Sequence, residues 1–298
     1  AALDGPDRPY LLFLQGGPGF EATRPTSPPS GWVARALQDY RVLLIDQRGT
    51  GRSTPVGATL PGATPAEQME YLALFRADSI VKDAELIRKE LQVDRWSILG
   101  QSFGGFTSLC YLSIAPTGLR EAFITGGLAP IGMPAEQVYA ATWERVGQKN
   151  RAFLERYPGD AARLRELRRR IDGEEIFLPS GDRLTVRRFD QIGLALGDSA
   201  GFESIHHLLE LDPTSNAFRH DVERFVGFAR NPIYATLHES SYADGVVTRW
   251  AAERTRPDRA VEEGWLTGEH VFRWMWEDYG ALRPHAAAAE LLAHHPWP

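Results

Sequence analysis

The sequence from Trp96 to Phe106 reads WSILGQSFGGF, and this stretch decides the fold. Its first four residues predict a short buried strand, and an apolar helix is expected from Phe106 to Ile114. Between them, residues 100–104 fit the pattern Gly-x-Ser-x-Gly, the sharp strand-to-helix turn that presents a nucleophilic serine. Glycines are needed because side chains at either flank would clash with so tight a turn. We therefore predict Ser102 as a nucleophile; the alternative is a serine that only caps the helix.

Strand and helix signals alternate around this turn. Short apolar runs at Tyr10–Leu14, Arg41–Ile45 and Ala122–Thr125 predict three further strands. A short helix is expected at Trp32–Leu37, and helical spacing of apolar residues extends over Ala66–Leu91. Such alternation, with apolar strands, is typical of a parallel sheet covered by helices on both faces.

The pattern changes in the second half. From about residue 134 onward the sequence is mostly helical, with one turn or hairpin expected at Leu178–Val186. The arginine cluster at Arg163–Arg170 is interpreted as a solvated helix face rather than a binding patch. The predicted parts are an incomplete α/β core over 1–128, a mainly helical cap over 129–285, and the start of a return to the core over 286–298.

Composition excludes several classes of protein. With 298 residues, 43 % hydrophobic and 24 % charged, the chain is neither disordered nor fibrous. Its net charge of −6 argues against nucleic acid or an anionic membrane surface as the main partner, and no apolar run approaches the length of a membrane span. A single cysteine, Cys110, cannot form an internal disulfide, and no Cys/His cluster has metal-ligand spacing. We expect no metal, no organic cofactor and a cytoplasmic location.

Two glycine-rich segments follow the first two strands. The first, QGGPG at 15–19, can bring backbone N–H groups close to a substrate oxygen. In an α/β-hydrolase, one such N–H and that of the residue after the nucleophile stabilise the oxyanion. We assign these donors to Gly17, with Gly16 as the alternative, and to Phe103. The second segment, DQRGTGRS at 46–53, lacks the third glycine of a dinucleotide fingerprint, and its Asp46 and Arg48 are interpreted as loop-bracing groups.

Together, three motifs resemble those of the prolyl aminopeptidases (proline iminopeptidases) in order and spacing: QGGPG at 15–19, DQRGTGRS at 46–53 and GQSFGG at 100–105. The resemblance covers Tyr10–Gly127, and the helical remainder looks like the family's cap domain. The family usually has histidine where this chain has Gln15. The resemblance implies an α/β-hydrolase core that releases N-terminal proline from peptides, through an acyl-enzyme on Ser102.

The resemblance also implies that glutamates of the cap bind the free α-amino group of the peptide. Glu239, in LHESSY at 237–242, is the first candidate, and Glu269 is the second; the alternative for each is a solvated helix carboxylate. An aminopeptidase needs such an anion because burying an unpaired ammonium is costly. Five aromatic residues could line an apolar slot for the proline ring; the alternative is that they pack in the core. They are Trp250, Trp265, Phe272, Trp274 and Trp276.

A serine nucleophile also needs a histidine base and an acid to orient it. The family's pattern would place both beyond Pro298, and no strand is expected after Ala286. We interpret the histidines as surface or cap residues, none of them the base: His206, His207, His220, His238, His270, His285, His294 and His295. We therefore expect a fragment that lacks both ends of the fold and is poorly stable and inactive alone. Two other functions stay open: an esterase on the same scaffold, and a catalytically silent binding protein.

Overall fold

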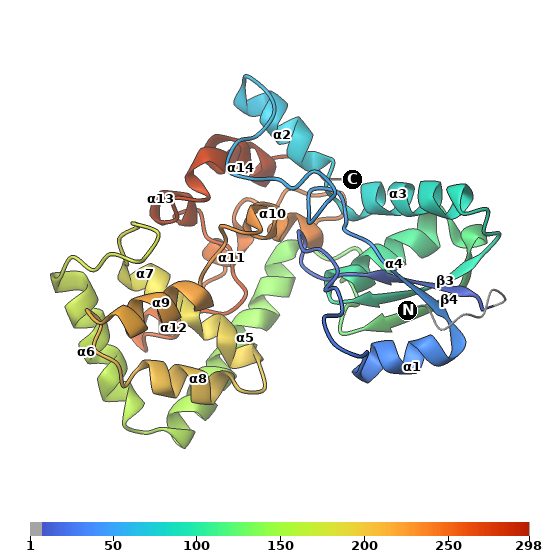
Figure 1. Cartoon of the computed structure of the whole chain (residues 1–298). Coiled ribbons are helices and arrows are strands. Elements are labelled where there is room, and N and C mark those ends of the chain that lie inside the picture. Colours follow the sequence, from blue (N-terminus) through green and yellow to red (C-terminus); the bar gives the residue numbers. More distant parts are fainter. Residues whose placement is uncertain (1–7, 298) are drawn as a thin grey trace. The chain divides into compact units, whose positions relative to one another are not determined.

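The computed structural model describes residues 8–297, which divide into two compact units (Figure 1). The first unit contains the residues up to Ile131 and the segment Asn231–Ser241. The second contains Gly132–Arg230 and the residues from Tyr242 onward. Residues 231–241 therefore lie with the first unit although the flanking stretches belong to the second. The domain ranges expected from the sequence stay a prediction.

The first unit is built on a four-stranded sheet in the order β2-β1-β3-β4. All three neighbouring pairs are parallel, which confirms the parallel sheet expected from the alternation. The strands are β1 (Tyr10–Leu14), β2 (Arg41–Leu44), β3 (Trp96–Gln101) and β4 (Leu119–Thr125).

Helices cover both faces of this sheet. Figure 1 shows α1 on one face and α3 and α4 on the opposite face. The helices of the first unit are α1 (Gly31–Asp39), α2 (Pro65–Ala73), α3 (Ala77–Glu90), α4 (Phe103–Ile114) and α10 (Pro232–Leu237). The helix α1 connects β1 to β2 on one face of the sheet. On the other face, α3 precedes β3 and α4 connects β3 to β4, so the order of the strands reverses beside β1.

That reversal positions the site. The chain leaves β1 for β2 on one side and later returns to β3 on the other, so the carboxyl ends of β1 and β3 lie next to each other. In open parallel sheets such a switch point is where ligands bind. The glycine loop follows β1 and Ser102 follows β3, so the fold brings the two predicted site segments to one edge.

Side-chain alternation along β1 builds the core. Leu12 and Leu14 are fully buried in a cluster with Ile98 and with residues of α3 and α4. Phe13, between them, points to the opposite face, where its ring centroid lies 4.6 Å from that of Trp32 on α1. A strand buried on both faces explains why Tyr10–Leu14 is apolar throughout rather than alternating.

The helical spacing expected over residues 66–91 corresponds to two separate helices, α2 and α3. Pro65 begins α2 within a capping box formed by Thr64 and Glu67. The helix ends at residue 73, and the Leu74 carbonyl accepts a hydrogen bond from the distant Arg48 at 2.9 Å. No glycine or proline marks this break, so local spacing could not reveal it.

The second unit is mainly helical, as expected. An antiparallel bridge between Phe177 and Arg183 forms the predicted turn. Arg169 pairs with Glu166 on the exposed face of α6, as expected of a solvated helix face, whereas Arg168 is half-buried and pairs with Asp190. None of the helices within residues 8–297 combines the length and apolar character of a membrane span. The helices of the second unit are α5 (Ala135–Arg156), α6 (Asp160–Gly173), α7 (Val186–Phe189), α8 (Gly201–Leu208), α9 (Asn216–Phe225), α11 (Ala251–Arg254), α12 (Asp258–Glu262), α13 (Met275–Asp278) and α14 (Ala286–Ala293).

Candidate active site

Ser102 sits on the sharp turn between β3 and α4 with a strained backbone. Its φ of 54° and ψ of −123° lie where residues with a side chain are rarely found. The Ser102 N–H donates to the Thr125 carbonyl at 3.1 Å, and its own carbonyl accepts from the Gly105 N–H at 2.8 Å. Both backbone groups of the serine are thus fixed, while its side chain is exposed. Strain held in place by surrounding structure is typical of a functional position.

Close packing explains the first glycine of the turn. A methyl group on Gly100 would lie 2.1 Å from the Gly104 carbonyl oxygen and 2.3 Å from the Ser108 hydroxyl. No side chain fits in that space. The helix α4 starts at Phe103, earlier than the Phe106 expected from the sequence.

The glycine loop and the start of α4 meet at Ser102. A methyl group on Gly16 would lie 3.0 Å from the Ser102 Cβ and 3.6 Å from its Oγ, so the loop passes beside the nucleophile. Phe103 opens the first turn of α4, where backbone N–H groups have no acceptor within the helix and the helix dipole is positive. An oxyanion forming at Ser102 would therefore lie near N–H groups from two separate segments. The choice of Gly17 over Gly16 as the loop donor stays a prediction.

The segment at 46–53 braces the first unit. The Asp46 carboxylate accepts the Arg52 backbone N–H at 2.9 Å and pairs with Arg24 at 2.7 Å. Arg48 binds both carboxylate oxygens of Asp83 on α3, at 2.6 and 2.7 Å. Hydrogen bonding to Asp83 raises the pKa of the Arg48 guanidinium above its ordinary value, so this anchor stays charged. These contacts fix the turn at 46–53, which follows β2, and attach it to α3.

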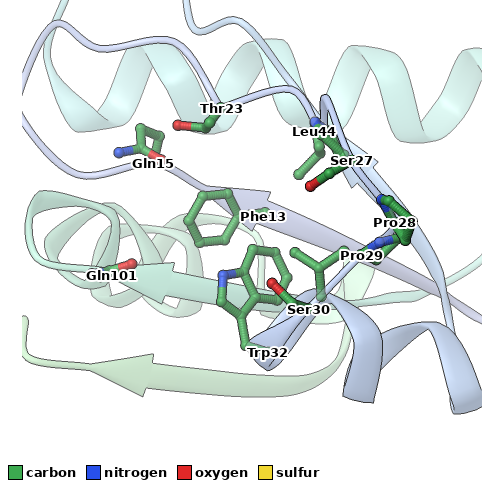
Figure 2. Close-up of a pocket in the computed structure, with 12 residues that line it drawn as sticks. Phe13, Gln15, Thr23, Ser27, Pro28, Pro29, Ser30, Trp32, Leu44 and Gln101 are labelled. Carbon is green, nitrogen blue, oxygen red and sulfur yellow. The ribbon is translucent and has the colours of Figure 1, made fainter.

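A pocket of about 330 Å³ lies at the carboxyl ends of β1 and β3 (Figure 2). The rings of Phe13 and Trp32 lie side by side in it, and Gln15 and Gln101 border it at the side of the serine turn. Residues 27–30, which precede α1, supply part of the wall. The remaining lining residues are Thr23, Pro25, Ser27, Pro28, Pro29, Ser30, Val33 and Leu44.

The two candidate amine-binding glutamates lie in different units. Glu239 belongs to the first unit, as Ser102 does, and is 6 % exposed. Glu269 is an exposed residue of the second unit. Burial of the Tyr242 phenol, together with the nearby charge of Glu269, raises the pKa of Tyr242. A nearly buried carboxylate in the unit of the nucleophile is the stronger candidate for a ligand ammonium.

The aromatic residues considered for a proline slot lie in the second unit. Trp265, Phe272 and Trp276 are buried there. The ring of Trp250 lies 5.0 Å from that of Trp276, and Phe272 stacks on Trp274 at 5.6 Å. Mutual packing of this kind favours the alternative of core residues.

Two features of the histidines differ from the expectation: the burial of His238 and the cluster formed by His206 and His207. His238 is 2 % exposed and belongs to the first unit, so it is not a surface residue. His206 and His207 gather with Glu210 into a group close enough to hold a metal ion, which spacing had not indicated. The carboxylates of Asp160 and Glu210 both lie against His206, at 2.8 and 3.9 Å, so this group is part of a polar network on the second unit. Within residues 8–297, no side chain donates or accepts a hydrogen bond at Ser102 Oγ.

Several known proteins are similar to this chain in sequence or fold. A family model for the α/β hydrolase fold matches residues 9–220. The chain is 50 % identical over 300 residues to a proline iminopeptidase of Aeromonas sobria, covering 96 % of this chain and 70 % of the relative. It is 35 % identical to a proline iminopeptidase of Aspergillus aculeatus, covering 98 % and 69 %. A solved proline iminopeptidase-related protein of Thermus thermophilus is 20 % identical with a TM-score of 0.36, covering 99 % and 93 %.

Proposed function

Because the chain belongs to the proline iminopeptidase family of α/β hydrolases, we propose that it acts as a serine aminopeptidase that releases proline from the N-terminus of peptides. The observation that carries this proposal is the strained turn at Ser102, beside which the glycine loop passes. A strand-to-helix turn of this form holds the serine oxygen outward, next to N–H groups that do not have to move during the reaction.

The reaction begins when Ser102 Oγ attacks the carbonyl carbon of the first residue. The hydroxyl proton passes to a general base, a role that histidine fills in serine peptidases, as the new C–O bond forms. The N–H groups of Phe103 and of Gly17 donate to the resulting oxyanion. The base then returns the proton to the leaving amine, the C–N bond breaks, and a prolyl ester remains on the serine. Water hydrolyses this ester, which releases proline and restores Ser102.

Selection for a peptide end requires an anion that meets the α-ammonium group. Glu239 supports this role because its carboxylate is nearly buried in the unit that also carries Ser102. A buried carboxylate whose charged partner is missing is costly, so a substrate without the positive charge is disfavoured. The same residue would therefore reject peptides with a blocked N-terminus.

Two substrates that differ only at the amino group test the proposal. Protein expressed from the complete reading frame should hydrolyse proline p-nitroanilide and should leave N-acetylproline p-nitroanilide largely intact. A fluorophosphonate probe should label the wild type, and Ser102→Ala should abolish the label. Equal hydrolysis of both anilides would favour an esterase-like hydrolase. Absence of label on Ser102 would favour a non-catalytic binding protein.

A further inference from the structure

The loop that carries the glycines is held at both ends by side-chain amides. Gln47 Nε2 donates to the Gln15 carbonyl oxygen at 3.0 Å. Asn231 Nδ2 donates to the Gly19 carbonyl oxygen at 2.8 Å. We propose that Gln47 and Asn231 are positioning residues that fix this loop, and so its oxyanion donor, beside Ser102. The inference rests on the proposed function, in which the loop supplies that donor.

Gln47 is itself rigidly held. It is 3 % exposed, and its own carbonyl accepts both the N–H and the hydroxyl of Thr50, at 3.0 and 2.7 Å. Its neighbours Asp46 and Arg48 anchor the same turn to Arg52 and to α3. The amide therefore meets the Gln15 carbonyl from a fixed base, at little further cost in side-chain entropy.

Peptide planarity carries this bond to the active site. The carbonyl of Gln15 and the N–H of Gly16 belong to one planar peptide unit and point in opposite directions. Fixing the Gln15 oxygen therefore fixes the direction of the Gly16 N–H. It also fixes the Gly16 Cα, from which the next peptide unit, with the Gly17 N–H, begins. Since Gly16 lies directly beside Ser102, a rotation of this peptide would move the loop's N–H groups relative to the nucleophile.

The far end of the loop is closed by the first turn of α10. Asn231 immediately precedes this helix and also lies 3.4 Å from Glu21 Oε2. A methyl group on Gly19 would lie 2.7 Å from Ile233 Cβ and 2.9 Å from the Tyr234 nitrogen, so the helix is in close contact with the loop. A segment more than two hundred residues later in the sequence thus limits where the loop can lie.

The expected effect follows from the geometry of an oxyanion hole. Its donors act only within hydrogen-bond reach of the developing charge, and misplacement by about 1 Å can cost about a hundredfold in rate. The bonds from Gln47 and Asn231 touch no substrate, so their loss should reduce transition-state stabilisation and spare ground-state binding. The kinetic signature is a fall in kcat with little change in KM.

The test uses Gln47→Met and Asn231→Ala in protein expressed from the complete reading frame. With proline p-nitroanilide, each variant should lose about 10- to 100-fold in kcat while KM changes by less than about threefold. Inhibition by the boronic acid analogue of proline, which forms a tetrahedral adduct on the serine, should weaken in parallel with kcat/KM. Inhibition by proline itself should not change. Wild-type kcat in both variants would overturn the proposal and leave the proposed function intact.

A matched control is available in the same unit. Gln68 Nε2 donates to the Gly62 carbonyl at 3.2 Å, in an exposed loop. Gln68→Met removes the same kind of bond and should leave kcat and boronate inhibition unchanged. A similar loss in this control would assign the effect to general destabilisation and overturn the proposal.

A second measurement does not depend on activity. Hydrogen exchange of the backbone amides of residues 16, 17, 19 and 20 should accelerate in Gln47→Met and in Asn231→Ala, but not in Gln68→Met. Unchanged exchange in this loop would contradict the proposal even if the enzyme were inactive for another reason. If Gln47→Met does not fold, the half-buried Asn231 provides the same test from the other end of the loop.

Discussion

Gly104 lies directly against the last residue of β1: a methyl group on Gly104 would lie 1.9 Å from the Leu14 carbonyl oxygen. Since Leu14 ends the strand before the glycine loop and Gly104 lies in the first turn of α4, this contact sets the approach of loop and nucleophile. Gly104→Ala should lower the free energy of unfolding by about 3 kcal/mol or more, because main-chain atoms on both sides must move. Chemical unfolding followed by tryptophan fluorescence measures this loss.

Gly57→Ala is the control for that substitution. Gly57 belongs to the same unit, and a methyl group there would have open space around it. Its stability should stay within about 0.5 kcal/mol of the wild type. Equal stability of Gly104→Ala and Gly57→Ala would contradict the close packing of the turn.

The strained backbone of Ser102 predicts that Ser102→Gly, which removes the nucleophile, stabilises the fold relative to Ser102→Ala. Ser102→Ala keeps a side chain at φ 54° and should retain the strain, whereas Ser102→Gly should relieve it. We expect the glycine variant to be more stable than the alanine variant by about 1 kcal/mol, with both unlabelled by fluorophosphonate. Parallel thermal unfolding of the two inactive proteins measures the difference. An alanine variant as stable as the glycine variant would mean that the turn is not strained.

The serine turn and the strand before the glycine loop could be predicted from sequence because their causes are local. Only glycine fits at position 100, where a methyl group would meet the nearby Gly104 carbonyl and Ser108 hydroxyl. The strand β1 is recognisable because it is apolar throughout, as expected of a strand covered by helices on both faces. The parallel sheet then follows from strand and helix alternation alone. These features need no information from distant residues.

Features that depend on distant contacts could not be predicted in this way. The break between α2 and α3 accompanies a bond from Arg48 to the Leu74 carbonyl, and no residue at the break itself disfavours a helix. The burial of His238 results from the packing of residues 231–241 with the first unit, whereas the stretches before and after this segment belong to the second unit. Asn231 likewise carries no local signal, because its partner Gly19 lies far away in the sequence.

The buried network at Glu85 predicts a dependence of stability on pH. Its carboxylate accepts hydrogen bonds from Arg88 at 2.7 Å and from Tyr111 at 2.5 Å, and Tyr111 accepts from the Trp96 indole at 3.0 Å. Bonding to Arg88, and then to Tyr111, outweighs burial and lowers the pKa of Glu85 below its ordinary 4.5. A carboxyl group with a lowered folded-state pKa stabilises the fold above about pH 4.5, and this contribution is lost as pH falls through the folded-state value.

Glu85→Gln isolates this contribution. At pH 7 the variant should be less stable than the wild type by about 1–3 kcal/mol, and the difference should shrink as the pH falls below 4.5. Glu90→Gln, at the exposed end of the same helix, serves as the control and should show little difference at any pH. Denaturant unfolding at pH 7, 5 and 3.5 provides the comparison. A deficit in Glu85→Gln that stays constant over this range would rule out a role of the charge.

Exchange of each candidate glutamate for glutamine decides which one binds the substrate's ammonium group. Glu239→Gln should lower kcat/KM for proline p-nitroanilide by about a hundredfold or more, because a buried ammonium would lose its charged partner. Glu269 is exposed in the second unit, so Glu269→Gln should change kcat/KM by less than about threefold. Fluorophosphonate labelling of Ser102 should persist in both, since the probe carries no amine. The opposite ranking of the two variants would transfer the amine-binding role to Glu269, and loss of labelling in Glu239→Gln would show that this carboxylate supports the serine site itself.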